Sequence, residues 1–226
     1  MIGGDRRDDF SLPPSGLTTK ARKVTREGDI HGFCRTRGAE SQVFCSLRSR
    51  REEEKYGFLD TTLKPNVQKA HHAISIDERR ASFRPTLWTE ADDSPRPNDD
   101  QMQQVWFPGV HSDVGGGYAD DRLSNITLKW MIDKAKGCGL LFDDSAVAQC
   151  LGAVPFDPLG PAHDEWKLIP WGLPSHRVVP SVAVMSSTVQ LRIDHAESAY
   201  LPANLSIADG KLEGYGTEVV LPDAAP

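Results

Sequence analysis

The run GVHSDVGGGY at Gly109–Tyr118, together with its two flanks, constrains the fold of this chain more than any other feature. Before it, QQVWF is a short apolar run of β-favouring residues that ends at Pro108 and Gly109, and this profile predicts a buried strand. After it, LSNITLKWMIDKAKG has apolar residues at helical spacing, Ser124 as N-cap and a closing glycine, which predicts a helix over 125–136. A strand, a tight turn and a capped helix in this order favour an α/β fold.

The tight turn carries two candidate catalytic residues, His111 and Asp113. In open α/β sheets the active site lies beyond the carboxyl ends of the strands, so a histidine directly after a strand is well placed to act as a general base near neutral pH. A hydrogen-bonded structural histidine is the competing interpretation. For Asp113 the sequence leaves three roles open: orienting a neighbouring group, binding a metal ion, or capping the turn. Ser112 lacks the strand–nucleophile–helix context of a serine nucleophile. The sequence contains no motif that predicts a cofactor or a metal ion.

Elsewhere the sequence predicts two more helices and two irregular stretches. Residues 66–80, NVQKAHHAISIDERR, place apolar residues at helical spacing after an asparagine N-cap, and 144–150 is expected to form a further short helix. The acidic stretch 89–101 is expected to be an exposed loop, and the region beyond Gly152, dense in proline and glycine, to wrap irregularly over the domain. The β-branched content of 181–193 leaves helix and strand both open.

Several other side chains favour structural roles. His71 and His72, on the helix predicted over 66–80, are interpreted as packed or solvent-facing. His163 and Asp164 remain open as neighbours of the site, because spacing alone does not decide whether the wrapped segment reaches the turn. Three tryptophans are interpreted as core residues: Trp88, Trp106 and Trp130.

Composition excludes some classes of protein. The net charge of -6 and pI near 5.6 argue against a general nucleic-acid binder, although basic residues cluster between Arg22 and Arg51. No apolar run approaches the roughly 20 residues of a membrane-spanning helix, and no secretory signal is recognised, so a cytoplasmic location is expected. Residues 1–55 are expected to be largely disordered, because they are poor in apolar side chains and lack sustained periodicity. The cysteines fit no metal or disulfide pattern and are interpreted as free thiols: Cys34, Cys45, Cys138 and Cys150.

Long stretches of the chain resemble one known family. VWFPGVHSDVGGGY followed by LSNITLKWMIDKA resembles the bacterial and fungal α/β-hydrolase domain family that includes the type VI secretion phospholipase effectors. YGFLDTTLKPNVQKAHHAISIDERRASFRPTLW, FDPLGPAHD, VVPSV and YLPANL look like the same family in the same order, over about 56–205. The resemblance implies a serine nucleophile in a GFSRGA-type elbow, an acidic partner and a histidine, of which His111 matches the histidine.

The chain departs from that family upstream of Tyr56. HGFCRTRGAE at 31–40 is a distorted echo of the elbow with Cys34 in place of serine, and it is interpreted as a coincidence or a decayed remnant because it lacks the flanking strand and helix. The strand and WDTVG-like turn of the family are also missing. We therefore expect an incomplete α/β-hydrolase-like sheet with flanking helices over 56–205, a disordered or non-homologous segment over 1–55 and a C-terminal tail over 206–226.

The predicted function follows from this comparison. The chain resembles a serine ester hydrolase of the phospholipase type, truncated and weakly active or inactive because the nucleophile is lacking, with an ester or phospholipid as substrate and export by a contact-dependent secretion system as a further implication. The alternative is a non-catalytic interaction module that docks with a separate partner chain supplying the missing half, as exposed sheet edges would favour. A third possibility is a poorly folding product of a disrupted gene.

Overall fold

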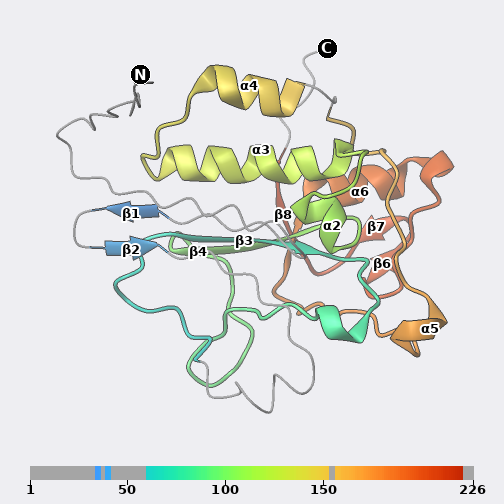
Figure 1. Cartoon of the computed structure of the whole chain (residues 1–226). Coiled ribbons are helices and arrows are strands. Elements are labelled where there is room, and N and C mark those ends of the chain that lie inside the picture. Colours follow the sequence, from blue (N-terminus) through green and yellow to red (C-terminus); the bar gives the residue numbers. More distant parts are fainter. Residues whose placement is uncertain (1–33, 37–38, 42–59, 153–155, 221–226) are drawn as a thin grey trace, which may run out of the picture.

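The computed structural model describes residues 34–36, 39–41, 60–152 and 156–220. Most of the segment 1–55 therefore lies outside the described residues. The strands and helices, labelled as in Figure 1, are β1 (Cys34–Thr36), β2 (Ala39–Ser41), β3 (Ala70–Ser75), η1 (Ala81–Phe83), β4 (Met102–Phe107), α2 (His111–Gly115), α3 (Arg122–Gly137), α4 (Asp144–Gly152), α5 (Leu168–Trp171), β5 (Val184–Ser186), α6 (Ser187–Asp194), η2 (Ala196–Ser198), β6 (Ile207–Ala208), β7 (Lys211–Leu212) and β8 (Gly216–Glu218).

A four-stranded parallel sheet in the order β3-β4-β5-β8 forms the centre of the molecule. β3 and β4 pair along their whole length, from Ala70 opposite Met102 to Ser75 opposite Phe107. In Figure 1, α3 lies along one face of this sheet with α4 outside it, and α2 lies at the end where β3 and β4 finish. The α/β fold with flanking helices is confirmed.

Both faces of the sheet are buried. One face packs against α3 through a cluster that includes Phe107 and Trp130, and the other face carries Ile74, Trp106 and Met185. A third cluster around Trp88 closes the amino ends of β3 and β4. The assignment of Trp88, Trp106 and Trp130 to the core is confirmed.

The helix predicted over 66–80 is wrong. This stretch contains β3, and all six residues from Ala70 to Ser75 are buried. Because both faces of β3 are buried, its residues do not alternate between apolar and polar, and their spacing matched a helix by accident. His71 and His72 are packed as expected, but on a strand, where they contact the rings of Trp130 and Trp88 respectively.

Other segments agree more closely with the sequence. The helix expected over 125–136 is α3, although it begins at Arg122 with Asp121 at the N-cap position instead of Ser124. The short helix after Asp143 is α4. The undecided stretch 181–193 contains both structures, since β5 runs directly into α6.

The C-terminal region wraps back onto the sheet. After the irregular stretch around α5, the chain adds β5, and β8 from the expected tail 206–226 joins the sheet beside it. Among the helices of the described ranges, none has the length and apolar character needed to cross a bilayer.

Candidate functional site

The carboxyl ends of β3 and β4 bring two charged segments together. β4 leads through a turn at Gly109, whose φ is 98°, into α2, which begins at His111. The tight turn expected to hold His111 and Asp113 is therefore the short helix α2. β3 leads into Asp77, Glu78 and Arg80 at the same edge of the sheet. Because parallel strands finish at one edge, this edge is where an α/β sheet holds its reactive groups.

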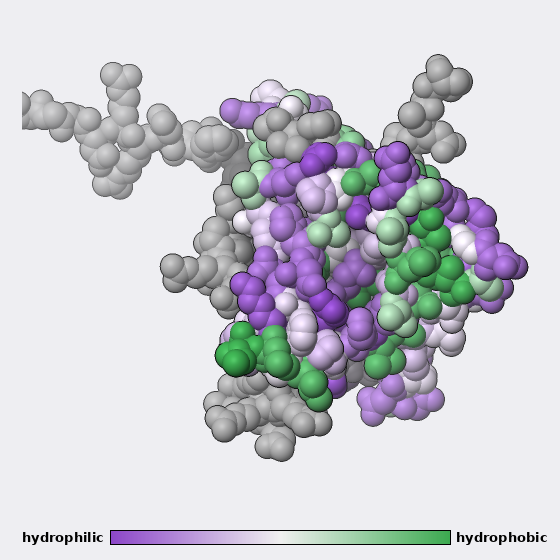
Figure 2. All heavy atoms as spheres, turned by 90° about the vertical axis from the view of Figure 1, so that its right-hand side faces the viewer, coloured by the Kyte–Doolittle hydropathy of each residue, from purple (hydrophilic) through white to green (hydrophobic). Residues whose placement is uncertain are grey.

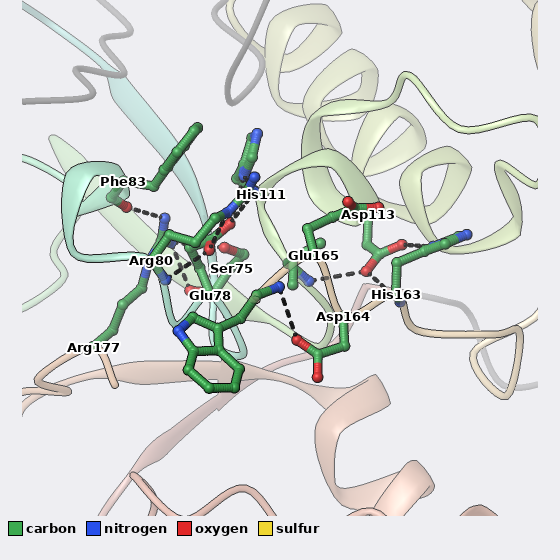
Figure 3. Close-up of polar contacts among 12 residues, drawn as sticks. Ser75, Glu78, Arg80, Phe83, His111, Asp113, His163, Asp164, Glu165 and Arg177 are labelled. Atoms are coloured by element: carbon green, nitrogen blue, oxygen red, sulfur yellow. Dashed lines mark hydrogen bonds and ion pairs between the residues drawn. The ribbon is translucent and has the colours of Figure 1, made fainter. Parts of the chain in front are cut away.

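Glu78 is the carboxylate partner of His111. Its Oε2 lies 2.6 Å from His111 Nδ1, and the two side chains are 1% and 4% exposed. Arg80 fixes the carboxylate by donating to Oε1 from Nε at 2.9 Å and to Oε2 from Nη2 at 2.8 Å. Figure 3 shows these groups converging between η1 and α2. The acid is therefore held rigidly against the imidazole.

The geometry selects one tautomer of the His111 ring. Arg80 Nη2 also lies 3.1 Å from Nδ1, but that nitrogen has one hydrogen-bonding position in the ring plane. The shorter contact with the Glu78 carboxylate assigns the proton to Nδ1, which donates it to Oε2. In the neutral ring, Nε2 is then the nitrogen free to accept a proton.

The charge state of Glu78 suits it to hold a proton on His111 Nδ1. Burial favours the neutral carboxyl, but the hydrogen bonds from Arg80 and His111 outweigh it and hold the pKa of Glu78 well below its usual range. The group is an anion throughout the neutral range. It therefore stabilises a positive charge on the ring of His111.

An aromatic side chain covers the imidazole. Phe83, at the end of η1, stacks on His111 with ring centroids 4.7 Å apart and an interplanar angle of 23°. Trp171 of α5 meets Phe83 edge-on at 5.7 Å. The Arg80 guanidinium lies 4.0 Å from the centre of the Phe83 ring. The site is lined by apolar and cationic groups together.

Asp113, the other sequence-predicted site residue, pairs with a second histidine. Its Oδ1 lies 2.6 Å from His163 Nδ1, and its Oδ2 accepts the backbone N–H groups of His163 at 3.0 Å and Val110 at 2.9 Å. Tyr118 stacks on the His163 ring. Asp113 thus closes its own turn and anchors the wrapped segment 50 residues later.

Asp77 ties the two strand ends to the C-terminal wrap. Its Oδ2 accepts the backbone N–H of Gly109 at 2.6 Å and the Tyr200 hydroxyl at 2.9 Å. Burial raises the pKa of Asp77 to about 6, against the opposing effect of these hydrogen bonds. The turn before His111 is therefore fixed by Asp77 from one side and by Asp113 from the other.

The sequence did not reveal Glu78 and Arg80 as site residues. Their signal was present, because the charged run DERR at 77–80 comes one residue after AHHAIS, much as HSD comes three residues after VWF. Placing both runs on a helix hid the parallel. His163, left open from the sequence, lies beside Asp113.

The part of the chain that the structure describes places no serine or cysteine in hydrogen-bond contact with the His111 ring, whose partners there are Glu78 and Arg80. Cys34 lies in β1, which pairs antiparallel with β2 in the register Cys34 opposite Ser41. A strand followed by another strand is not the strand–turn–helix of a nucleophile elbow. Within the described ranges, no three His, Cys, Asp or Glu side chains are arranged to hold a metal ion.

The comparisons with known proteins agree with the motif at Gly109–Tyr118 and with the helix that follows it. Residues 35–134 match the family model described as T6SS, Phospholipase effector Tle1-like, catalytic domain, which confirms the family resemblance. The match begins inside the segment 1–55, and the expectation that the chain carries only the C-terminal part of the domain stays a prediction. The match includes Glu78, His111 and Asp113 and ends within α3, before His163. The family is one of phospholipase-type hydrolases.

A second similarity is to an uncharacterized protein of Saccharomyces cerevisiae, YEL023C, which is 49% identical over 49 residues. That stretch covers 20% of this chain and 7% of the yeast protein. No solved structure matches the chain significantly.

Proposed function

We propose that the chain carries the acid–base half of an ester hydrolase that acts on phospholipids, with His111 as the general base and Glu78 as its orienting carboxylate. One observation carries the proposal. The buried Glu78 carboxylate contacts His111 Nδ1 at 2.6 Å while Arg80 locks it in place, at the carboxyl end of a parallel sheet. The match to a phospholipase catalytic domain supplies the substrate class.

The chemistry follows from the tautomer. His111 Nε2 takes the proton from an attacking hydroxyl as that oxygen bonds to the ester carbonyl carbon, and Glu78 stabilises the imidazolium that forms. The imidazolium then returns the proton to the departing alcohol as the ester C–O bond breaks. Water repeats the cycle to release the fatty acid. Asp113, which contacts His163 and not His111, is proposed as a positioning residue for the turn.

The test is hydrolysis of a soluble short-chain ester and of phospholipid vesicles by the whole chain. Glu78→Gln and His111→Asn are expected to lower turnover by about 10²-fold or more, because the first removes the anion that stabilises the imidazolium and the second removes the general base. Glu197→Gln, at an exposed carboxylate, is the matched control and should leave turnover unchanged. Turnover that survives in both site variants would show that this acid–base pair is not used.

The nucleophile can be sought directly. A fluorophosphonate ester labels an activated serine, and a thiol-directed ester probe labels a reactive Cys34. Labelling that requires His111 would identify the attacking group in this chain. If Cys34 is not labelled, it is not the nucleophile.

The second candidate function is a docking module whose partner chain completes the site. It is favoured by the position of β3, which lies at one edge of the described sheet and leads to Glu78. An added strand beside β3 would finish at the same edge and deliver its last residue next to the acid–base pair. Co-expression with a chain that carries a serine elbow should then restore hydrolysis that this chain lacks alone. If purified chain alone turns over ester at the rate of the mixture, no partner is needed.

A further inference from the structure

The segment Trp166–Val178 exposes an unusual amount of apolar surface. Leu168, Ile169 and Leu173 are 58%, 84% and 81% exposed. α5 projects at the lower right of Figure 1, and Figure 2, which views that side, shows apolar side chains gathered beside hydrophilic ones. Apolar side chains clustered on a surface usually mark an interaction site, since covering them removes an unfavourable contact with water.

Two tryptophans hold this segment against basic side chains. The Trp166 indole donates to the carbonyl oxygen of Gly172 at 3.1 Å, and the Arg79 guanidinium lies 5.1 Å from the ring centre. The Arg80 guanidinium lies 5.2 Å from the ring of Trp171. Indole rings that are partly buried and hydrogen-bonded are the side chains enriched at membrane–water interfaces.

The charge around the apolar side chains is positive. No aspartate or glutamate occurs from Trp166 to Val178, whereas Lys167 is exposed within the segment. Arg84, also exposed, donates to the Ser175 hydroxyl at 3.1 Å and so lies against the segment. Of the two acidic residues directly before the segment, Glu165 accepts the Tyr118 hydroxyl at 3.1 Å and Asp164 is paired with Arg79. Exposed cations beside apolar side chains complement anionic headgroups.

The apolar segment is continuous with the candidate site. Trp171 contacts Phe83 edge-on at 5.7 Å, and Phe83 stacks on His111 at 4.7 Å. Two aromatic rings therefore separate the exposed surface from the imidazole. A surface docked on α5 would lie directly beside the site.

We propose that the segment Trp166–Val178 docks on the surface of a bilayer that contains anionic phospholipids. Leu168, Ile169 and Leu173 enter the boundary between headgroups and acyl chains, while Lys167 and Arg84 contact the phosphates. Docking in this orientation brings lipid esters to the His111 edge of the sheet. The benefit of docking rests on the proposed function, since it delivers lipid esters to His111. Binding to a bilayer is nevertheless measurable without turnover.

The experiment is flotation of the whole chain with vesicles of phosphatidylcholine alone or mixed with phosphatidylglycerol. The patch variant is Leu168→Ser/Ile169→Ser/Leu173→Ser, and it should lose at least about tenfold in vesicle affinity, because three apolar side chains no longer enter the interface. The matched control changes three exposed apolar side chains elsewhere: Leu141→Ser/Leu201→Ser/Val219→Ser, at 87%, 70% and 69% exposure. The control should bind like the original chain.

Charge is tested separately. Lys167→Glu/Arg84→Glu should weaken binding to the vesicles with phosphatidylglycerol by about tenfold, with little change for phosphatidylcholine alone, and added salt should mimic it. An original chain that fails to float, or patch and control variants that lose binding equally, would overturn the proposal. A dimer that forms without lipid in analytical ultracentrifugation, and that dissociates in the patch variant, would also overturn the proposal. The partner that covers the segment would then be a second copy of this chain.

The two proposals fail in different ways. Vesicle binding without hydrolysis of any ester contradicts the proposed function and leaves docking intact. Hydrolysis of a soluble ester without vesicle binding contradicts docking and leaves the acid–base pair intact.

Discussion

Gly109→Ala is the substitution that most directly tests the turn that presents His111. Gly109 has a φ of 98°, and a methyl group added there would meet Asp113 Cβ at 2.4 Å and Oδ2 at 2.7 Å. Gly117 has a φ of 125° with nothing within 4 Å of an added methyl group. The two glycines share an unfavourable backbone for alanine and differ in the space around it.

The expected magnitudes differ accordingly. Both alanine variants should lose about 1–2 kcal/mol through backbone strain at positive φ. Gly109→Ala alone must also displace Asp113, which holds His163 and the Val110 N–H, and overpacking with lost hydrogen bonds adds about 2–4 kcal/mol. A total stability of about 5–15 kcal/mol makes this difference large.

Urea denaturation followed by circular dichroism measures it. With a slope of about 2–3 kcal/mol per molar for a chain of this size, the midpoint of Gly109→Ala should lie about 1 M below that of Gly117→Ala. Equal midpoints would refute the close packing of Gly109 on Asp113. Equal midpoints would also mean that Asp113 does not require a glycine at position 109.

Three further substitutions test the strand-end network. Because burial raises the pKa of Asp77 to about 6 in the folded chain, its contribution to stability is complete below about pH 4 and is lost as pH rises through 6. Asp77→Asn, neutral at every pH, should flatten a fall of about 3 kcal/mol over that range in pH-dependent urea titrations; an unchanged profile would contradict the assignment. Glu78→Gln should cost about 3–5 kcal/mol, because it leaves the buried Arg80 guanidinium without its anion, and adding Arg80→Met should recover part of the loss in the same assay. The stability from Glu78, whose folded pKa is lowered, should be present above its unfolded pKa of about 4.5 and decline as pH falls below it. Arg177→Met should lower stability by about 3 kcal/mol in thermal unfolding, because the carbonyl oxygens of Ser75 and Phe83 lose their donor, and a loss below about 1 kcal/mol would argue against those bonds.

Local patterns accounted for some elements of the fold. β4 and α3 were predictable because a short β-favouring run and an amphipathic repeat are properties of neighbouring residues. The boundary of α3 differed by three residues, as helix ends depend on contacts beyond the local pattern. β3 was misassigned because burial on both faces erases the alternation that marks a strand.

The candidate site, like the fold, was only partly predictable from local sequence. His111 could be placed from sequence, because it follows a recognisable strand inside a family motif. Its partner could not, since Glu78 lies 33 residues earlier and meets the imidazole only when β3 and β4 pair in parallel. Asp113 illustrates the converse, because a residue two positions from His111 points to His163 instead.

By itself the sequence determined the α/β class, the strand β4 and the helix α3 on either side of the HSD motif, and the place of His111 after that strand. The tertiary structure alone decided which carboxylate contacts which histidine and which apolar side chains remain exposed beside them. The physical reason is that periodicity and turn chemistry act between neighbours along the chain, whereas pairing of buried charges depends on strand register and on segments that the fold brings together.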